Sequence, residues 1–418
     1  MKYLPESRVN NWAKWALLNL VIVASLGVLL RYKMLFSLPS VHYKNLLHGH
    51  SHFAFAGWVS TALFVAIARV LQKKSGLLSS IYYKIFILFQ VSSFGMLVTF
   101  PVQGYALWSI CFSTLSILTS YLFCWIGWKD ISRSALHTTV KYLFKTALFF
   151  FFLSSLGAFA LAYMMAVKVN DPAKMLSGAY FFLHFQYNGW FLFALMGLFL
   201  QKLIDWYAPE APVSGIMPAF RLLAFSVVPG YLLSLLWMRV PTWVQILAGL
   251  AGVLQLAAAG VILAKLMRPV RVIWRQFTRV ARILWLMAIS AFVIKVILQA
   301  LSAVPSLSLI SFAYRPVVIG YLHLVLLAFV SLFLLGYFLE ERLFSLHTGT
   351  AKWGLAGFVS GVILNEVFLM IQGIGVLSNT GIPGMNHLLL GVVSLIFAGI
   401  AVFYSQQVSY RPYLNLPA

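Results

Sequence analysis

Long apolar runs separated by short polar connections make up almost the whole chain. A run of roughly 20 apolar residues is long enough to cross a bilayer as a helix. The runs lie at residues 12–30, 48–71, 80–101, 104–128, 141–167, 177–201, 215–237, 242–267, 280–304, 316–338, 352–376 and 384–406. This pattern predicts an all-α polytopic membrane protein, with residues 1–418 forming a single transmembrane domain of about twelve helices.

Composition and charge support the membrane interpretation. Hydrophobic residues make up 62% of the chain and charged residues 9%, which is too apolar for a soluble protein. The net charge of +22 does not indicate nucleic acid, because the basic residues lie in short connections between apolar runs. Most Lys and Arg residues fall at the termini and after even-numbered runs, which predicts a cell (inner or plasma) membrane protein with both termini cytoplasmic. Membrane lipid is the first expected partner.

A histidine motif recurs along the chain at a spacing of four runs. The pattern H-F-x3-G-W-x3-A-L begins at His52 and again at His184 with identical gaps, and a looser copy begins at His323. Gly57 and Gly189 lie five residues after their histidines and leave room for a flat macrocycle or for a neighbouring helix. The repetition indicates one kind of site built several times, although common ancestry or aromatic packing is the competing interpretation.

Six histidines fall at one level near the outer ends of four runs. They are His48, His50, His52, His184, His323 and His387. Ionisable side chains are costly inside a bilayer, so their common depth predicts a shared site that faces the bundle interior. Imidazole is a good ligand for haem iron and for copper, and these are the expected metals. For His387, close to the interface, a simple hydrogen bond is an equal alternative.

The three histidines of the second run cannot all serve one site. His48 and His52 are four residues apart on one helix face, and His50 points nearly the opposite way. At most two of them can act together, and the sequence leaves open which.

Three other polar residues inside the runs are candidates for chemistry. Glu366 and Lys295 are the clearest intramembrane charges, and either they pair with each other or one belongs to a proton path or quinone site. Tyr187 shares a helix face with His184, where it is a candidate for proton transfer or for core hydrogen bonding.

The twelve runs and the histidine motifs on runs two, six and ten resemble the catalytic subunit of the haem-copper oxidase superfamily, whose helices form three arcs of four. The segment His50-x-His52-x4-Gly57 also resembles the entry motif of the NnrS family of membrane haem proteins. The resemblance implies a non-covalent b-type haem held by His323 and a second-run histidine, His50 or His52, with His48 as a third choice. It also implies a copper ligand at His184. His387 has no counterpart in the oxidases, but it could replace a missing ligand if its run lies beside run two or run ten.

One departure from the oxidases bears on copper. The run at 215–237 has no histidine where the oxidases have an adjacent pair, so the resemblance leaves copper binding open. The expected function is electron transfer, or binding or reduction of oxygen or nitric oxide, with quinol or cytochrome c as electron donor; a haem sensor without turnover is equally compatible. The alternative is a secondary transporter or cofactor-handling membrane protein, with Glu366 and Lys295 as its coupling site.

Overall fold

Apolar helices long enough to cross a membrane account for most of the chain in the computed structural model, which describes residues 3–206, 215–304, 306–309, 314–378 and 380–410. Twelve such helices occur among these residues. They span Glu6–Leu35, Tyr43–Ser75, Ile81–Gln103, Leu107–Arg133, Thr138–Ala166, Pro172–Trp206, Met217–Leu235, Thr242–Gln276, Arg279–Leu301, Arg315–Glu340, Gly349–Gly375 and Met385–Val408. The prediction of an all-α polytopic membrane protein is confirmed, and each predicted run matches one helix.

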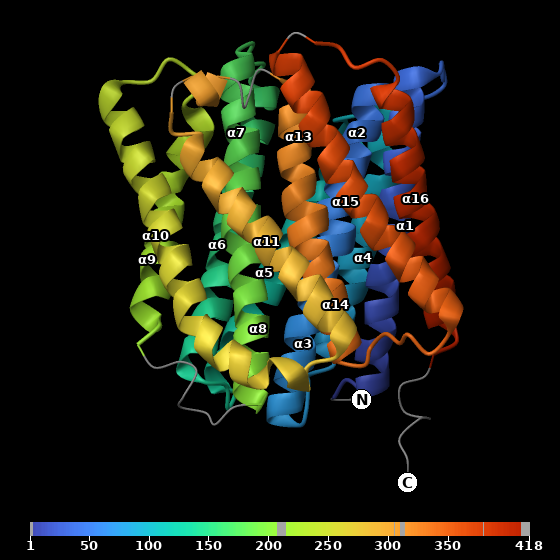
Figure 1. The fold of residues 1–418 in the computed structure, drawn as a ribbon, viewed down its shortest axis with the longest axis vertical. Helices are drawn as coiled ribbons and strands as arrows, with labels where there is room; N and C mark the ends of the chain where they lie inside the picture. The colour runs from blue at the N-terminus through green and yellow to red at the C-terminus, as the bar shows by residue number, and fades with distance from the viewer. Residues whose placement is uncertain (1–2, 207–214, 305, 310–313, 379, 411–418) are drawn as a thin grey trace. The chain divides into compact units, whose positions relative to one another are not determined.

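Nine of the spans hold a single main helix (Figure 1). These helices are α1 (Glu6–Leu35), α4 (Ile81–Gln103), α5 (Leu107–Arg133), α6 (Thr138–Ala166), α9 (Met217–Gly230), α10 (Thr242–Ile273), α11 (Arg279–Leu301), α15 (Gly349–Leu377) and α16 (Met385–Val408). Pro229 lies inside α9, and the chain tightens after it into a short 3-10 helix, η3 (Tyr231–Leu235). Proline removes a backbone donor and so weakens the helix around it.

The other three spans, numbers two, six and ten, contain a π-helical segment between two α-helices. They consist of α2 (Tyr43–His52), η1 (Phe53–Ser60) and α3 (Thr61–Ser75); α7 (Pro172–His184), η2 (Phe185–Phe191) and α8 (Leu192–Trp206); and α13 (Arg315–His323), η5 (Leu324–Ser331) and α14 (Leu332–Glu340). Every residue of η1 and η2 is buried, and so are six residues of η5. These three spans therefore carry the most enclosed parts of the fold.

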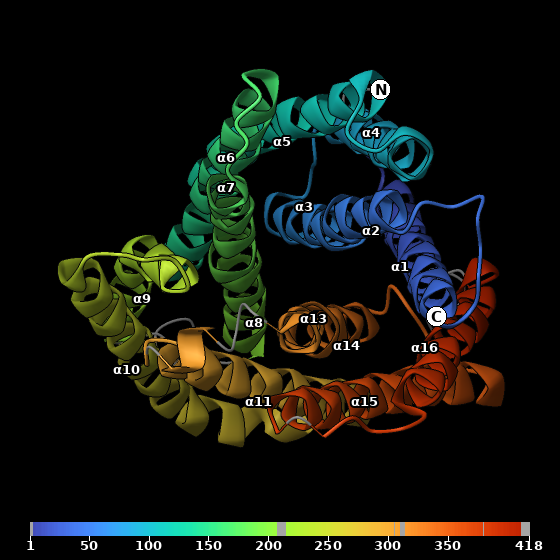
Figure 2. The ribbon, with the colours of Figure 1, turned by 90° about the horizontal axis from the view of Figure 1, so that it is seen from above.

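The helices divide into two compact units. Unit 1 comprises the described parts of Met1–Phe123, Ile283–Trp285 and Leu322–Ala418, and unit 2 comprises those of Cys124–Arg282 and Leu286–Tyr321. In unit 1, α2 and η1 pack between α1 and α4, η1 contacts η5, and α16 lies between α1 and α15 (Figure 2). In unit 2, α6 packs along the whole length of the α7–η2–α8 span, and α9 packs against α10. That the whole chain acts as one domain stays a prediction.

Ion pairs tie the ends of several unit 1 helices together. Arg69 and Lys73, both in the last part of α3, pair with Glu6 of α1 and with Glu341, which follows α14. The Glu341 side chain is only 2% exposed, so its charge depends on these partners. This cluster fixes three chain segments at the end of the unit opposite the histidines of α2.

Candidate functional site

Each of the three motif histidines lies immediately before a π-helical segment. His52, His184 and His323 end α2, α7 and α13, and η1, η2 and η5 begin at the next residue. π-helical turns are rare and are frequently found at functional sites. The looser third copy shares this feature with the other two, which supports treating all three as one repeated element.

Side chains bond to carbonyl groups within the π segments of unit 1. Thr61 Oγ1 donates to the Ala56 carbonyl at 3.0 Å and Ser331 Oγ to the Leu326 carbonyl at 2.6 Å, each five residues back. Trp58 Nε1 of η1 donates to Ser331 Oγ of η5 at 2.8 Å. This bond fixes the second and tenth spans to each other below their histidines.

The motif glycines admit neighbouring side chains. Gly57 offers its carbonyl to Asn19 Nδ2 of α1 at 2.5 Å, and a side chain at position 57 would meet the ring of Phe53. A side chain at Gly189 would meet Phe150 of α6. At Gly189 the structure thus shows close packing against a neighbouring helix, whereas at Gly57 the space is taken by Phe53 of the same span.

The ring of His50 faces α1 and His323. The ring hydrogen-bonds to the Val23 carbonyl of α1. Its Nδ1 is buried without a hydrogen-bond partner, so Nε2 is the atom that donates to Val23. The ring interacts electrostatically with His323. Gly27, one turn after Val23, has no side chain, and a Cβ placed there would lie 3.7 Å from His50 Cε1. His50 is thus the second-span histidine that is paired with the tenth span.

His48 and His52 face α4 and the turn that follows it. The His52 ring stacks on Phe100 at 4.3 Å and 6°, and its Nε2 lies 3.1 Å from the Tyr105 hydroxyl. The His48 ring meets the edge of Tyr105 at 4.7 Å, and its Nε2 is buried without a partner. Burial raises the pKa of Tyr105 to about 12, so the phenol keeps its proton at neutral pH. The two faces of α2 therefore present two separate histidine groups.

His184 belongs to a closed hydrogen-bonded network in unit 2. Asn188 Nδ2 lies 3.1 Å from Nδ1, and Nε2 lies 2.8 Å from the Val227 carbonyl. An amide N–H can only donate, so Nδ1 accepts and Nε2 carries the proton that goes to Val227. Lys295 Nζ of α11 donates to Asn188 Oδ1. Both ring nitrogens are therefore engaged in hydrogen bonds, and copper binding at this histidine stays a prediction.

The distorted end of α9 explains why its carbonyls are available. The Tyr231 N–H bonds to the Val228 carbonyl as the chain enters η3, which leaves the Val227 carbonyl for His184. The Ser226 carbonyl accepts from Gln255 Nε2 of α10 at 2.9 Å, and Gln255 Oε1 accepts from Gln299 of α11. Side chains from two other spans thus complete the backbone hydrogen bonding of α9, and Gln299 of a third span bonds to one of them.

Tyr187 packs close to His184 but is not hydrogen-bonded to it in the network above. The two ring centroids are 6.3 Å apart, and the Tyr187 ring also meets the edge of Tyr321 at 5.9 Å. Its hydroxyl bonds to Ser234 of η3. The phenol is buried with the rest of η2, so its proton-transfer role stays a prediction.

The two predicted intramembrane charges each have an amide neighbour. Lys295, which is 2% exposed, donates to Asn188 in unit 2. Glu366 of α15, in unit 1, accepts from Asn365 Nδ2 at 3.2 Å. The structure therefore relates Lys295 to the His184 network, a link that the sequence did not indicate.

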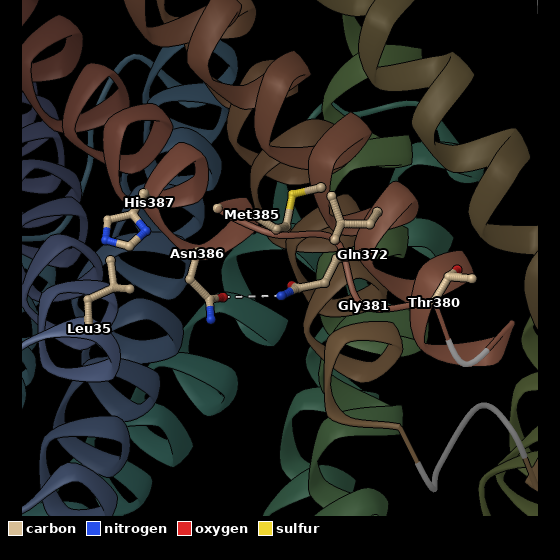
Figure 3. A pocket seen from close by; sticks show the side chains of 9 residues that line it. Leu35, Gln372, Thr380, Gly381, Met385, Asn386 and His387 are labelled. Atoms are coloured by element: carbon tan, nitrogen blue, oxygen red, sulfur yellow. Dashed lines mark hydrogen bonds between the residues drawn. The ribbon is translucent and has the colours of Figure 1, made fainter.

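His387 lines a pocket of about 300 Å³ at the start of α16 (Figure 3). The lining includes Leu35 of α1, and Gln372 Nε2 of α15 donates to Asn386 Oδ1 at 3.1 Å. The His387 side chain is exposed, and its ring meets the edge of Phe36 at 6.5 Å. The pocket lining holds no second histidine, and the two roles predicted for His387, ligand and interfacial hydrogen bonding, both stay predictions.

Sequence reasoning missed Tyr105 and Asn19, although both contact the motif. Tyr105 follows Gly104, whose φ of 64° reverses the chain beside α2, so a tyrosine directly after a tight turn at the histidine level was the available signal. Asn19 is one polar residue in an apolar helix and gave no pattern.

Among the described residues, no three His, Cys, Asp or Glu side chains are placed to hold a metal ion together. A scan against family models and a search of curated proteins give no match to this chain.

Proposed function

We propose that the chain is an integral membrane haem protein whose low-spin haem is held in unit 1 by His50 and His323. The observation that carries the proposal is the state of the His50 ring. One of its nitrogens donates to the Val23 carbonyl, and Nδ1 is buried without a partner beside His323. Metal-ligating histidines commonly donate their second ring N–H to a backbone carbonyl, which fixes the tautomer and the ring orientation.

The residues around this pair suit a flat cofactor. Gly27 of α1 places no side chain against His50 Cε1, and the Trp58–Ser331 bond holds the second and tenth spans together. His50 and His323 come from different helices, so a group bound by both would also link them. A haem bound there would supply reversible one-electron chemistry, with its potential governed by the two imidazoles and the apolar surroundings.

Of the functions that the resemblance implies, electron transfer within the cell membrane is the best supported. Reduction of oxygen or nitric oxide would need a second metal centre, and both nitrogens of its expected ligand His184 are engaged. We infer a quinol or a cytochrome c as the electron donor, and we infer cytoplasmic termini from the distribution of Lys and Arg.

The test is the absorption spectrum of detergent-purified protein, oxidised and then reduced with dithionite, with iron and copper measured on the same sample. We expect a low-spin haem spectrum, lost in His50→Ala and in His323→Ala because each substitution removes one axial ligand. His347→Ala, in an exposed loop, is the matched control and should keep the spectrum.

Two outcomes would reject the proposal. If His52→Gln loses the haem while His50→Ala keeps it, the ligand face of α2 is the other one. Protein that is expressed with haem available, and that folds but holds neither haem nor copper, would make the transporter interpretation the leading one.

A further inference from the structure

His48 and His52 form a second group of ligand atoms that the proposed haem site does not use. They lie one turn apart on the face of α2 opposite His50, and they interact electrostatically with each other. His48 Nε2 is buried without a partner, and His52 Nε2 lies 3.1 Å from the Tyr105 hydroxyl. Histidines at positions i and i+4 of a helix can bind one metal ion from the same face.

The surroundings hold both rings in place. Phe100 stacks on His52, and the rings of Tyr105 and His48 form an edge-to-face pair with a centroid distance of 4.7 Å. A Cβ at Gly49 would lie 2.9 Å from the Pro101 ring, so α2 approaches the end of α4 closely only because this residue is glycine. The turn through Gly104 then returns Tyr105 to the histidines. Such rigid placement is what a metal site needs from its supporting residues.

We propose that His48 and His52, with the Tyr105 hydroxyl beside them, bind one Cu²⁺ or Zn²⁺ ion. Imidazole nitrogen suits both ions, and water molecules complete the coordination. Binding exchanges the Tyr105–His52 hydrogen bond for a bond from His52 Nε2 to the metal, and the lone pair of His48 Nε2 gains a partner. The Tyr105 hydroxyl is then free to hydrogen-bond a coordinated water.

The charge of Lys44 predicts the direction in which its removal changes metal affinity. This residue lies one turn before His48 and interacts electrostatically with it. A cation bound at His48 is repelled by the Lys44 ammonium, whereas an anionic ligand would be attracted. Lys44→Gln should therefore strengthen metal binding a few-fold, and the opposite result would show that the group recognises an anion.

The experiment is titration of the purified full-length protein with Cu²⁺ alone, followed by electron paramagnetic resonance, and with Zn²⁺ by calorimetry. We expect one Cu²⁺ ion to bind tightly to each protein molecule, with hyperfine coupling of the copper electron spin to two nitrogens. His48→Gln and His52→Gln should each weaken binding by roughly 100-fold and remove one nitrogen coupling, and Tyr105→Phe should weaken binding by about tenfold.

Two controls separate this site from others. His347→Gln, exposed in a loop, should leave this tight Cu²⁺ binding unchanged, and His323→Ala should keep it even if the haem is lost. Unchanged copper affinity in both His48→Gln and His52→Gln, with each variant monodisperse on gel filtration, would overturn the proposal. If these variants aggregate, the direction of the Lys44→Gln effect decides the question in protein that retains both histidines.

Discussion

At the scale of single residues, polar side chains in the apolar interior mostly serve backbone groups that irregular helices release. Asn19 reaches the Gly57 carbonyl of η1 and also exchanges two hydrogen bonds with Gln90 of α4. His184 and Gln255 do the same for the end of α9. A buried carbonyl without a donor costs about 1–3 kcal/mol, so each of these side chains has a structural reason to be polar.

The unit 2 network gives a prediction about His184. Asn188→Leu removes the partner of both His184 Nδ1 and the buried Lys295 ammonium or amine, and we expect a loss of about 2–4 kcal/mol in the free energy of unfolding. The folded fraction should keep the low-spin haem spectrum, because the proposed ligands lie in unit 1. Thermal unfolding in detergent and the absorption spectrum measure the two effects.

Asn188→Asp is the comparison for that variant. A carboxylate at position 188 can still accept from Lys295, so its destabilisation should be smaller than that of Asn188→Leu. If Asn188→Leu unfolds normally but loses haem, the network acts on the cofactor rather than on stability.

At the scale of helices, the sequence predicted every span but not the π segments. The apolar runs set where a helix crosses the membrane, and the observed ends differ from the predicted ones mostly by a few residues. The eighth span is the largest exception, because it continues through the basic residues to Gln276. The spacing of H-F-x3-G-W-x3-A-L is the same whether the backbone bonds run to the fourth or the fifth residue, so periodicity alone does not distinguish them.

Glycines control how closely α15 and α16 pack. A Cβ at Gly354 would lie 2.6 Å from the Phe403 nitrogen, and one at Gly361 would lie 3.0 Å from the Ile396 nitrogen. Small residues at such spacing allow the backbones of membrane helices to approach and make dispersion contacts. Gly399 lies opposite, where a Cβ would come 2.8 Å from the Gly354 carbonyl oxygen.

Gly399→Leu should therefore separate the two helices and lower the unfolding temperature measured in detergent, at a cost of about 3 kcal/mol or more. Gly391→Leu is the matched control, because a Cβ at Gly391 would meet no atom within 4 Å and the residue lies in the same helix. Equal destabilisation by the two substitutions would mean that helix propensity, not packing, is responsible.

At the scale of the whole chain, an even number of spans puts both termini on one side if every span crosses the membrane. The loop charges predict that this side is the cytoplasm. In a variant with Cys111 and Cys124 replaced by serine, Asn170→Cys between α6 and α7 should react with a membrane-impermeant maleimide in intact cells. Arg275→Cys, at the basic end of the eighth span, should react only after lysis. The reverse pattern would invert the orientation.

The candidate sites could be predicted in part at this scale. The common depth of the histidines was predicted from the positions of the apolar runs, and the pairing of the second and tenth runs as haem ligands was implied by the resemblance to the oxidases. The separation of His50 from His48 and His52 also followed from helix geometry. The choice of His50 as the proposed haem ligand required its contacts with the Val23 carbonyl and Gly27 of α1, and no local sequence pattern links these residues to His50. Tyr105, and the link of Lys295 to His184 through Asn188, likewise emerged only from contacts between distant segments.

The three π segments also affect how the copies of the motif align. A π turn holds more residues than an α turn over the same rise, so a span that contains one is longer in sequence than a regular helix of equal length. The copies starting at His52 and His184 align without a gap because both carry this extra length at the same place, and the span after His323 carries it too. The irregularity therefore occurs in all three copies, including the third, which has Ala328-Phe329 in place of the Gly-Trp pair.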